Sequence, residues 1–126
     1  MEQKKRILIV DDDRDILESL RMLLEAKGYE IETAETGKEA LDKFTTASFD
    51  LALLDVKLPD MEGQELLARI RSSPSGSSAV KIMLTGSASR KDMMESLSQG
   101  ADGYILKPIK PRDLMKLLDE KLKTKK

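Results

Sequence analysis

The sequence predicts an α/β fold in which helices cover both faces of one parallel sheet, in a doubly wound arrangement. Two observations lead to this prediction. Five short apolar runs alternate along the chain with segments whose apolar residues recur at helical spacing. Such alternation favours right-handed crossovers between parallel strands. The runs also differ in character, since two are continuously apolar and one alternates apolar with polar residues.

Each predicted strand is short. The five strands are expected at residues 7–10 (ILIV), 29–33 (YEIET), 51–54 (LALL), 80–84 (VKIML) and 103–106 (GYIL). The alternating run at 29–33 is typical of a sheet edge, and the continuous runs at 7–10 and 51–54 are typical of interior strands buried on both faces. The predicted strand order is therefore 2-1-3-4-5, in which the carboxyl ends of the first and third strands border a crevice.

Five helices are predicted between and after these strands. Their apolar positions are Ile16, Leu20 and Leu23; Ala40, Leu41 and Phe44; Leu66, Leu67 and Ile70; Met93, Met94 and Leu97; and Leu114, Leu117, Leu118 and Leu122. Thr36 and Glu39 have the spacing of a capping box at the second helix. Ser89 can cap the fourth helix, and Pro111 suits the first turn of the last. Five β-α units result.

The composition is that of a globular domain. The chain has 126 residues, 40% of them hydrophobic and 36% charged, so residues 1–126 are expected to form one domain around one sheet. No apolar run could span a bilayer and no signal-peptide pattern is present, so we expect a cytoplasmic protein without a membrane partner. The 22 basic and 23 acidic residues, with two Phe and two Tyr, do not suggest nucleic-acid binding.

Two residue types are missing from the chain, and their absence excludes several kinds of chemistry. Without cysteine, disulfides, zinc-thiolate sites and thiol nucleophiles are excluded. Without histidine, Ser-His-Asp catalysis and most transition-metal sites are excluded as well. Carboxylates, hydroxyls and lysines remain as the groups that could carry chemistry.

An acidic cluster is expected where the first and third strands end. Asp11, Asp12 and Asp13 directly follow one strand, and Asp55 follows the other. Adjacent carboxylates repel one another, so such a cluster needs a cation or a ligand. A hard divalent cation is the natural partner of carboxylate oxygens, with Mg²⁺ the commonest and Mn²⁺ a substitute. Asp13 is better explained as the N-cap of the helix that follows.

A hydroxyl and an ammonium are expected at the same edge of the sheet. Thr85 closes the fourth strand and Lys107 closes the fifth. With a divalent cation neutralising the cluster, one carboxylate could attack phosphorus and form an acyl phosphate. Thr85 and Lys107 would then hold the phosphoryl oxygens by a hydrogen bond and by charge. These residues predict phosphoryl transfer to an aspartate.

With these residues in place, the chain resembles the receiver domains of response regulators in two-component signalling, including the chemotaxis receiver. The resemblance rests on ILIVDDD, LALLDVKLPDMEG, IMLTG and GYILKP in this order, and it covers residues 5–122. It implies a flavodoxin-like fold and a phosphoacceptor switch with no enzymatic activity beyond its own phosphorylation and dephosphorylation. A sensor histidine kinase or histidine phosphotransfer protein would donate the phosphoryl group, and a downstream protein or output domain would respond.

The resemblance assigns the metal and acceptor residues. Asp55 would accept the phosphoryl group. Asp12 and Asp55 would bind Mg²⁺ directly, and Asp11 would bind it through water. The backbone carbonyl of Lys57 would complete the protein ligands. The segment LPDMEG, residues 58–63, is expected to form a turn in which a glycine supplies backbone freedom near the metal.

The resemblance also assigns a switch. Thr85 would move toward the phosphoryl oxygens, and Tyr104 would rotate into the space that the threonine leaves. Lys107 would bind the phosphoryl group, and its peptide bond to Pro108 would be cis. The surface of the fourth helix, fifth strand and fifth helix would change, and this face could bind an output partner or form a homodimer. Its charged residues are Arg90, Lys91, Asp92, Lys110, Arg112 and Asp113.

Three positions beside the site are expected to tune it. Gly86 stands where the family often carries alanine, and the missing methyl group should ease both access to the phosphoryl group and rotation of Tyr104. Lys57, two residues after the acceptor, could shield the phosphoryl group from water. Ser87 is small and leaves this shielding to Lys57.

Three other functions compete with this interpretation. A haloacid-dehalogenase-type phosphohydrolase would use Asp11 and Asp13 as its Asp-x-Asp motif, but it needs a further acidic pair after the lysine and would leave Asp55 unexplained. A flavodoxin-like electron carrier shares the topology, but three aspartates in its first loop would repel the flavin phosphate. A receiver-like interaction module that takes no phosphate is the third alternative.

Overall fold

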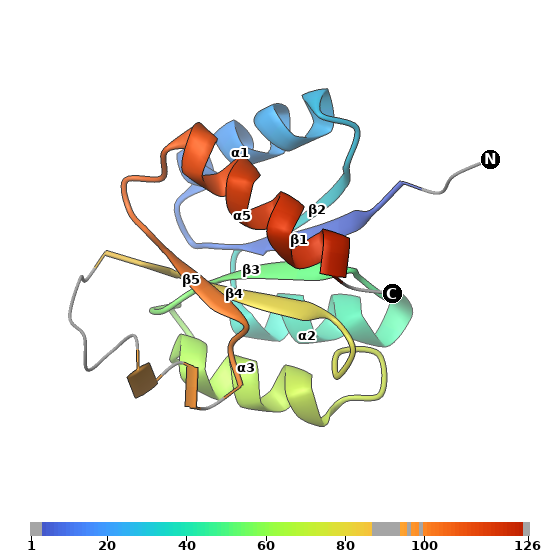
Figure 1. Ribbon diagram of the computed structural model, residues 1–126. Helices are drawn as coiled ribbons and strands as arrows, with labels where there is room; N and C mark the ends of the chain where they lie inside the picture. Colours follow the sequence, from blue (N-terminus) through green and yellow to red (C-terminus); the bar gives the residue numbers. More distant parts are fainter. Residues whose placement is uncertain (1–3, 87–93, 96, 99, 125–126) are drawn as a thin grey trace.

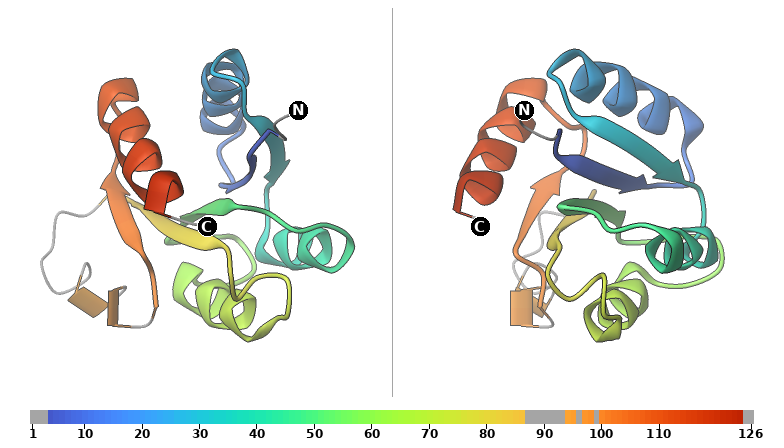
Figure 2. Two further views of the ribbon diagram at one scale, coloured as in Figure 1. Left: turned by 45° about the vertical axis from the view of Figure 1, so that its right-hand side comes forward. Right: turned by 90° about the vertical axis from the view of Figure 1, so that its right-hand side faces the viewer.

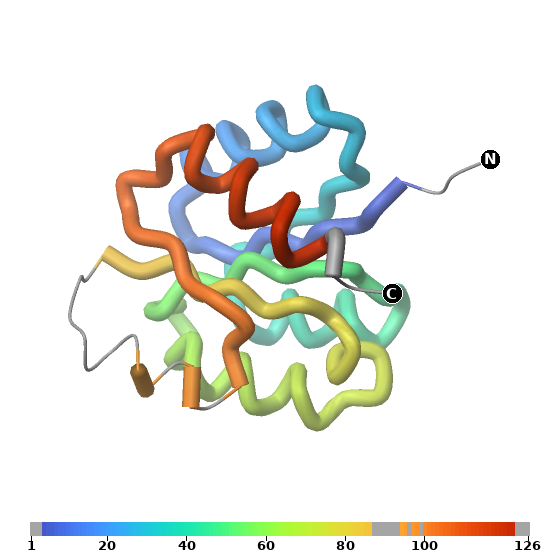
Figure 3. The backbone as a smooth tube through the Cα atoms, viewed as in Figure 1, coloured from blue at the N-terminus to red at the C-terminus, as the bar shows by residue number. Residues whose placement is uncertain are grey.

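Five parallel strands form one sheet in the order β2-β1-β3-β4-β5 in the computed structural model, which describes residues 4–86, 94–95, 97–98 and 100–124 (Figure 1). The strands are β1 (Arg6–Val10), β2 (Glu30–Ala34), β3 (Leu51–Asp55), β4 (Val80–Thr85) and β5 (Gly103–Leu106). All neighbouring pairs run parallel. The predicted fold class and strand order are therefore confirmed, and the carboxyl ends of β1, β3, β4 and β5 lie at one edge of the sheet (Figure 3).

Helices cover both faces of the sheet. They are α1 (Arg14–Ala26), α2 (Gly37–Thr46), α3 (Gly63–Ser72) and α5 (Pro111–Thr124). α1 and α5 lie on one face, and α2 and α3 lie on the other (Figure 1, Figure 2). The predicted fourth helix lies largely outside the described residues, Ser89 and Met93 included, although Met94 and Leu97 are helical and exposed. Among the described residues, no helix has the length and apolar character needed to cross a membrane.

Strand side chains alternate between two apolar cores. Leu8 and Leu54 face the core under α2 and α3, whereas Ile7 and Leu53 face the core under α1 and α5. Residues 7–10 and 51–54 are all 0% exposed, as the continuous apolar runs predicted for interior strands. The edge position of β2, with its partly exposed side chains, agrees with its alternating pattern.

β2 begins one residue later than predicted, at Glu30. The reason lies in the end of α1. Gly28 has a φ of 97°, and the N–H of Tyr29 donates to the carbonyl of Leu24 at 3.1 Å. Because this hydrogen bond caps the helix, the backbone N–H of Tyr29 is not available to the sheet.

Side chains cap the helices near the site. Asp13 is the N-cap of α1 and accepts from the N–H groups of Asp15 and Ile16. Thr36 accepts from the N–H of Glu39 at 3.0 Å, but the Glu39 carboxylate accepts from residue 35 instead of from Thr36. These caps set where the loops after β1 and β2 end.

Candidate functional site

Asp11 is fully buried directly after β1. Its backbone N–H donates to Ala34 at 3.1 Å, and its Oδ1 accepts from the N–H of Asp13 at 3.0 Å. Oδ2 forms an ion pair with the Lys107 Nζ at 2.9 Å but accepts no well-aligned hydrogen bond from any described residue. One oxygen of this buried carboxylate therefore retains unused capacity for an electropositive partner.

Asp55 ends β3 beside Asp11. Its side chain is nearly buried, and its Oδ1 lies 3.2 Å from the Lys107 Nζ. Asp11, Asp12 and Asp55 each offer one carboxylate oxygen, and these oxygens all lie within 4.8 Å of one another. Asp12 is exposed, so the cluster is open to solvent on its side. The structure thus brings together the three carboxylates that the sequence places at neighbouring strand ends.

The cluster carries more negative than positive charge. Burial raises the pKa of the Asp55 carboxyl, the charge of Asp11 raises it further, and Lys107 and the backbone N–H of Lys57 only partly oppose this. Burial also tends to lower the pKa of Lys107, but its interactions with Asp11 and then Asp55 leave that pKa raised. The Lys107 ammonium contacts only two of the three carboxylates, Asp11 and Asp55. Carboxylate oxygens are hard donors, and a cluster of three fits a divalent cation such as Mg²⁺.

Asp55→Asn is expected to raise the melting temperature of the metal-free protein near neutral pH. Because the pKa of Asp55 is higher in the folded state than its unfolded value of 3.8, the ionised carboxylate destabilises the fold above the folded pKa. This penalty diminishes as the pH falls through the folded pKa. Melts in EDTA should therefore show a difference between variant and wild type that shrinks toward a pH of about 4. A difference in melting temperature that does not change with pH would contradict the conclusion that the ionised Asp55 carboxylate destabilises the fold.

Thr85 and Lys107 lie at the same edge of the sheet. Thr85 ends β4, is nearly buried, and pairs with Leu106 of β5. The backbone N–H of Lys107 donates to the Thr85 carbonyl at 2.7 Å, which sets the start of the Lys107 side chain beside the cluster. The peptide bond between Lys107 and Pro108 is cis.

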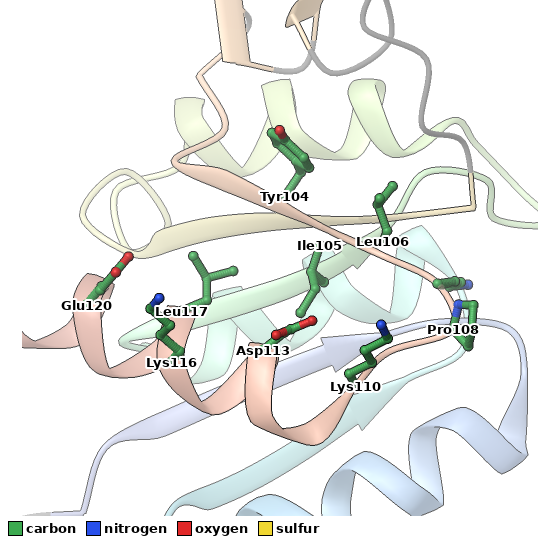
Figure 4. A pocket seen from close by; sticks show the side chains of 10 residues that line it. Tyr104, Ile105, Leu106, Pro108, Lys110, Asp113, Lys116, Leu117 and Glu120 are labelled. Atoms are coloured by element: carbon green, nitrogen blue, oxygen red, sulfur yellow. The ribbon is translucent and has the colours of Figure 1, made fainter.

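Tyr104 lies on β5 and pairs with Met83 of β4. Met83 is two residues before Thr85 on the same strand. Because side chains alternate along a strand, Tyr104 and Thr85 are on the face that Met83 occupies, which is the side of α2 and α3. Tyr104 is 37% exposed, and its ring points away from α5, on the opposite side of β5 from Ile105 (Figure 4).

Of the three positions expected to tune the site, the structure describes Lys57 and Gly86. Lys57 is exposed and pairs with Glu62 through an isolated antiparallel bridge. Gly86 is exposed, and no described atom lies within 4 Å of the position that a Cβ would occupy. Ser87 lies outside the described residues, as do Arg90, Lys91 and Asp92 of the expected output face.

Gly63 has a different role from the one that the sequence suggested. Among the described glycines only Gly28 and Gly100 have positive φ, so Gly63 is not needed for backbone freedom. A Cβ on Gly63 would instead lie 2.8 Å from the Val56 Cα and closer still to the Asp55 carbonyl oxygen. Steric contact between the start of α3 and the end of β3 therefore requires glycine here.

Comparison with known proteins decides the family. A family model described as the response regulator receiver domain matches residues 7–119. The chain belongs to the response regulator receiver domain family. As a receiver domain it is a phosphoacceptor signalling switch of two-component systems, and the phosphohydrolase alternative is not favoured.

Solved receiver domains share both fold and sequence with this one. A CheY-like receiver domain protein from Methanospirillum hungatei JF-1 is 50% identical, with a TM-score of 0.91 over 98% of this chain and 97% of that chain. The receiver domain of the sensor histidine kinase PA1611 from Pseudomonas aeruginosa PAO1 is 25% identical, with a TM-score of 0.88 over 97% of this chain and 100% of that chain. The PA1611 structure contains a magnesium ion coordinated in its active-site cleft.

Curated relatives include longer regulators. The transcriptional regulatory protein ResD of Bacillus subtilis (strain 168) is 38% identical over 110 residues, which are 87% of this chain and 45% of ResD. Other matched regulators are covered to a similar extent. The receiver domain thus spans about half the length of these relatives.

Proposed function

We propose that Asp55 accepts a phosphoryl group from a phosphohistidine of a sensor kinase or phosphotransfer protein, in a reaction that requires Mg²⁺. The decisive observation is the cluster of Asp11, Asp12 and Asp55, with the Lys107 ammonium against two of its members. These carboxylates and the backbone carbonyl of Lys57 would hold the metal, which Mn²⁺ could replace. The magnesium ion in the PA1611 cleft supports this assignment.

Each residue of the site would have a separate role in phosphoryl transfer. A carboxylate oxygen of Asp55 attacks phosphorus, the new O–P bond forms, and the P–N bond of the donor breaks with its electron pair left on the imidazole. Bound Mg²⁺ supplies charge stabilisation for the phosphoryl oxygens. Lys107, already 3.2 Å from Asp55, would contact one phosphoryl oxygen, and the Thr85 hydroxyl would donate to another. Water later hydrolyses the acyl phosphate.

The output surface would include the groove between β5 and α5 (Figure 4). Movement of Thr85 and rotation of Tyr104 would alter this surface when the phosphoryl group adds roughly two negative charges. Charged residues of both signs line the groove, namely Lys107, Lys110, Asp113, Lys116 and Glu120. A mixed set of this kind can pair with a copy of itself about a two-fold axis, so a homodimer is one proposed partner beside an output protein or domain.

All described elements share one sheet and its two cores. This supports the proposal that residues 1–126 form a single receiver domain. Its only proposed chemistry is its own phosphorylation and dephosphorylation.

Intact mass after incubation with acetyl phosphate tests the proposed function. We expect wild type to gain one phosphoryl group in Mg²⁺ and none in EDTA. Asp55→Asn should gain none, whereas Asp42→Asn, at an exposed aspartate of α2, should behave as wild type. If folded, Mg²⁺-binding protein gains nothing from acetyl phosphate, phosphoramidate or a histidine kinase, the interaction-module alternative is favoured instead.

Lys57→Asn is expected to shorten the lifetime of the phosphorylated state. The Lys57 side chain is exposed two residues after Asp55, where a long cation can hinder the approach of water. We expect dephosphorylation to accelerate about threefold, which corresponds to roughly 0.7 kcal/mol of barrier. Phosphoryl loss is followed by intact mass after removal of the donor, with Lys116→Asn as the control. An unchanged lifetime would refute the shielding role.

Gly86→Ala is expected to slow phosphorylation by acetyl phosphate while leaving the melting temperature unchanged. The added methyl group would enter space that no described atom occupies within 4 Å, so the fold should tolerate it. It would nevertheless stand beside Thr85, where we expect it to hinder the approach of the donor to Asp55. Intact mass measures the initial phosphorylation rate, and thermal melts measure the melting temperature. Equal phosphorylation rates in Gly86→Ala and wild type would contradict the predicted slowing.

A further inference from the structure

The β3–α3 loop, residues 56–62, is closed at its base by backbone contacts. The N–H of Gly63 donates to the Val56 carbonyl at 2.6 Å, and Lys57 pairs with Glu62 through the isolated bridge. The loop begins directly after the proposed phosphoacceptor. Its conformation therefore sets the backbone of Lys57, the residue proposed to contribute a metal-binding carbonyl.

The apex of this loop is attached to a different element, the N-terminus of α2. The Asp60 carboxylate accepts from the N–H of Gly37 at 2.9 Å and from the N–H of Lys38 at 3.0 Å. Met61 packs at the same place, because a Cβ on Gly37 would lie 2.6 Å from its Cγ. These hydrogen bonds hold the pKa of Asp60 below its usual value, so the carboxylate is charged where the helix N-terminus favours an anion.

Asp60 does not replace the ordinary cap of α2. Thr36 already accepts from the N–H of Glu39. Asp60 accepts from the two N–H groups that precede Glu39, those of Gly37 and Lys38. The helix thus has one cap from its own segment and one from the loop after β3. Removing either cap affects α2, but only removal of the Asp60 side chain also detaches the apex of the loop from α2. This difference separates the two roles.

We propose that Asp60 is a positioning residue for the metal and phosphoryl site, acting by anchoring the apex of the β3–α3 loop to α2. The anchor holds the Lys57 backbone, whose N–H contacts the Asp55 carboxylate and whose carbonyl would bind the cation. Without it, binding must first order the loop, and this ordering weakens affinity. The inference rests on the proposed function, because it assumes that Mg²⁺ binds at this cluster.

Calorimetric titration of Mg²⁺ into wild type, Asp60→Ala and Thr36→Ala tests the proposal. We expect Asp60→Ala to raise the Kd about threefold to tenfold, a smaller effect than is usual for groups that directly orient a metal ligand. Thr36→Ala is the matched control, because it removes the other cap of α2 without touching the loop. It should lower the melting temperature by a comparable amount and leave the Kd unchanged.

Two further measurements separate positioning from general destabilisation. Asp60→Asn retains one carbonyl acceptor and should recover part of the affinity. In acetyl phosphate labelling, Asp60→Ala should need more Mg²⁺ for half-maximal rate, by the same factor as its Kd, and reach the wild-type rate at saturation. An unchanged Kd in Asp60→Ala, or an equal rise in Thr36→Ala, would overturn the proposal. Wild type that binds Mg²⁺ but takes no phosphoryl group would instead contradict the proposed function alone.

Discussion

Lys107→Met is expected to lower the free energy of unfolding of the metal-free protein by about 1–3 kcal/mol. The Lys107 ammonium contacts Asp11 at 2.9 Å and Asp55 at 3.2 Å, and Asp11 is fully buried. Removing one partner of a buried ion pair leaves an uncompensated charge and costs about 3–5 kcal/mol. We expect less here because the lysine side chain is 23% exposed and water screens part of the interaction.

The stability lost in Lys107→Met should be largely recovered with Mg²⁺. A cation that binds only the folded state stabilises it, and the variant offers that cation a more negative cluster. Because the pKa of Lys107 is raised on folding, the contribution of the lysine is fully present below its unfolded value of 10.5 and is lost only at higher pH. Urea unfolding near neutral pH, in EDTA and in Mg²⁺, measures both effects. Lys110→Met, at an exposed lysine, is the control, and wild-type stability of Lys107→Met in EDTA would refute the argument.

Gly63→Ala is expected to destabilise the fold by about 1–3 kcal/mol or more and to weaken Mg²⁺ binding. The new Cβ would overlap backbone atoms of Asp55 and Val56, with the Val56 Cα at 2.8 Å. Backbone atoms cannot move aside as a flexible side chain can, so either α3 or the end of β3 must shift. The gain in helix propensity from glycine to alanine is at most about 1 kcal/mol and does not offset the overlap.

The measurement for Gly63→Ala is urea unfolding together with Mg²⁺ titration. Gly86→Ala serves as the matched control, because it adds the same methyl group where no described atom lies within 4 Å. Stability should fall only in Gly63→Ala. Equal stability of the two variants would mean that the start of α3 adjusts without strain, and the steric role of Gly63 would then be wrong.

Much of the fold could be predicted because burial leaves a periodic signal. The continuous apolar runs at 7–10 and 51–54 correspond to strands buried on both faces, and the alternating run near 30 corresponds to the edge strand. The start of β2 could not be predicted to the residue. It depends on a hydrogen bond between Tyr29 and Leu24 that closes α1, and the apolar character of Tyr29 suits a strand equally well.

The centre of the candidate site could also be predicted, because parallel strands end at one edge of a sheet. Asp11, Asp55 and Lys107 each follow an apolar run, and the structure brings their charged groups into contact. Asp60 could not be predicted from any pattern. Its partner, Gly37, is 23 residues earlier in the chain, at the start of α2.

The sequence by itself determined the fold class, the strand order and the acidic cluster with its lysine, because hydrophobic period and strand-end position are properties of single segments. Only the tertiary structure decided that Gly63 is required for steric reasons and that Asp60 anchors the loop after Asp55. Both depend on the approach of two separately formed elements. Hydrogen bonds and overlaps of this kind arise when those elements pack, so neither segment carries a local signal of them.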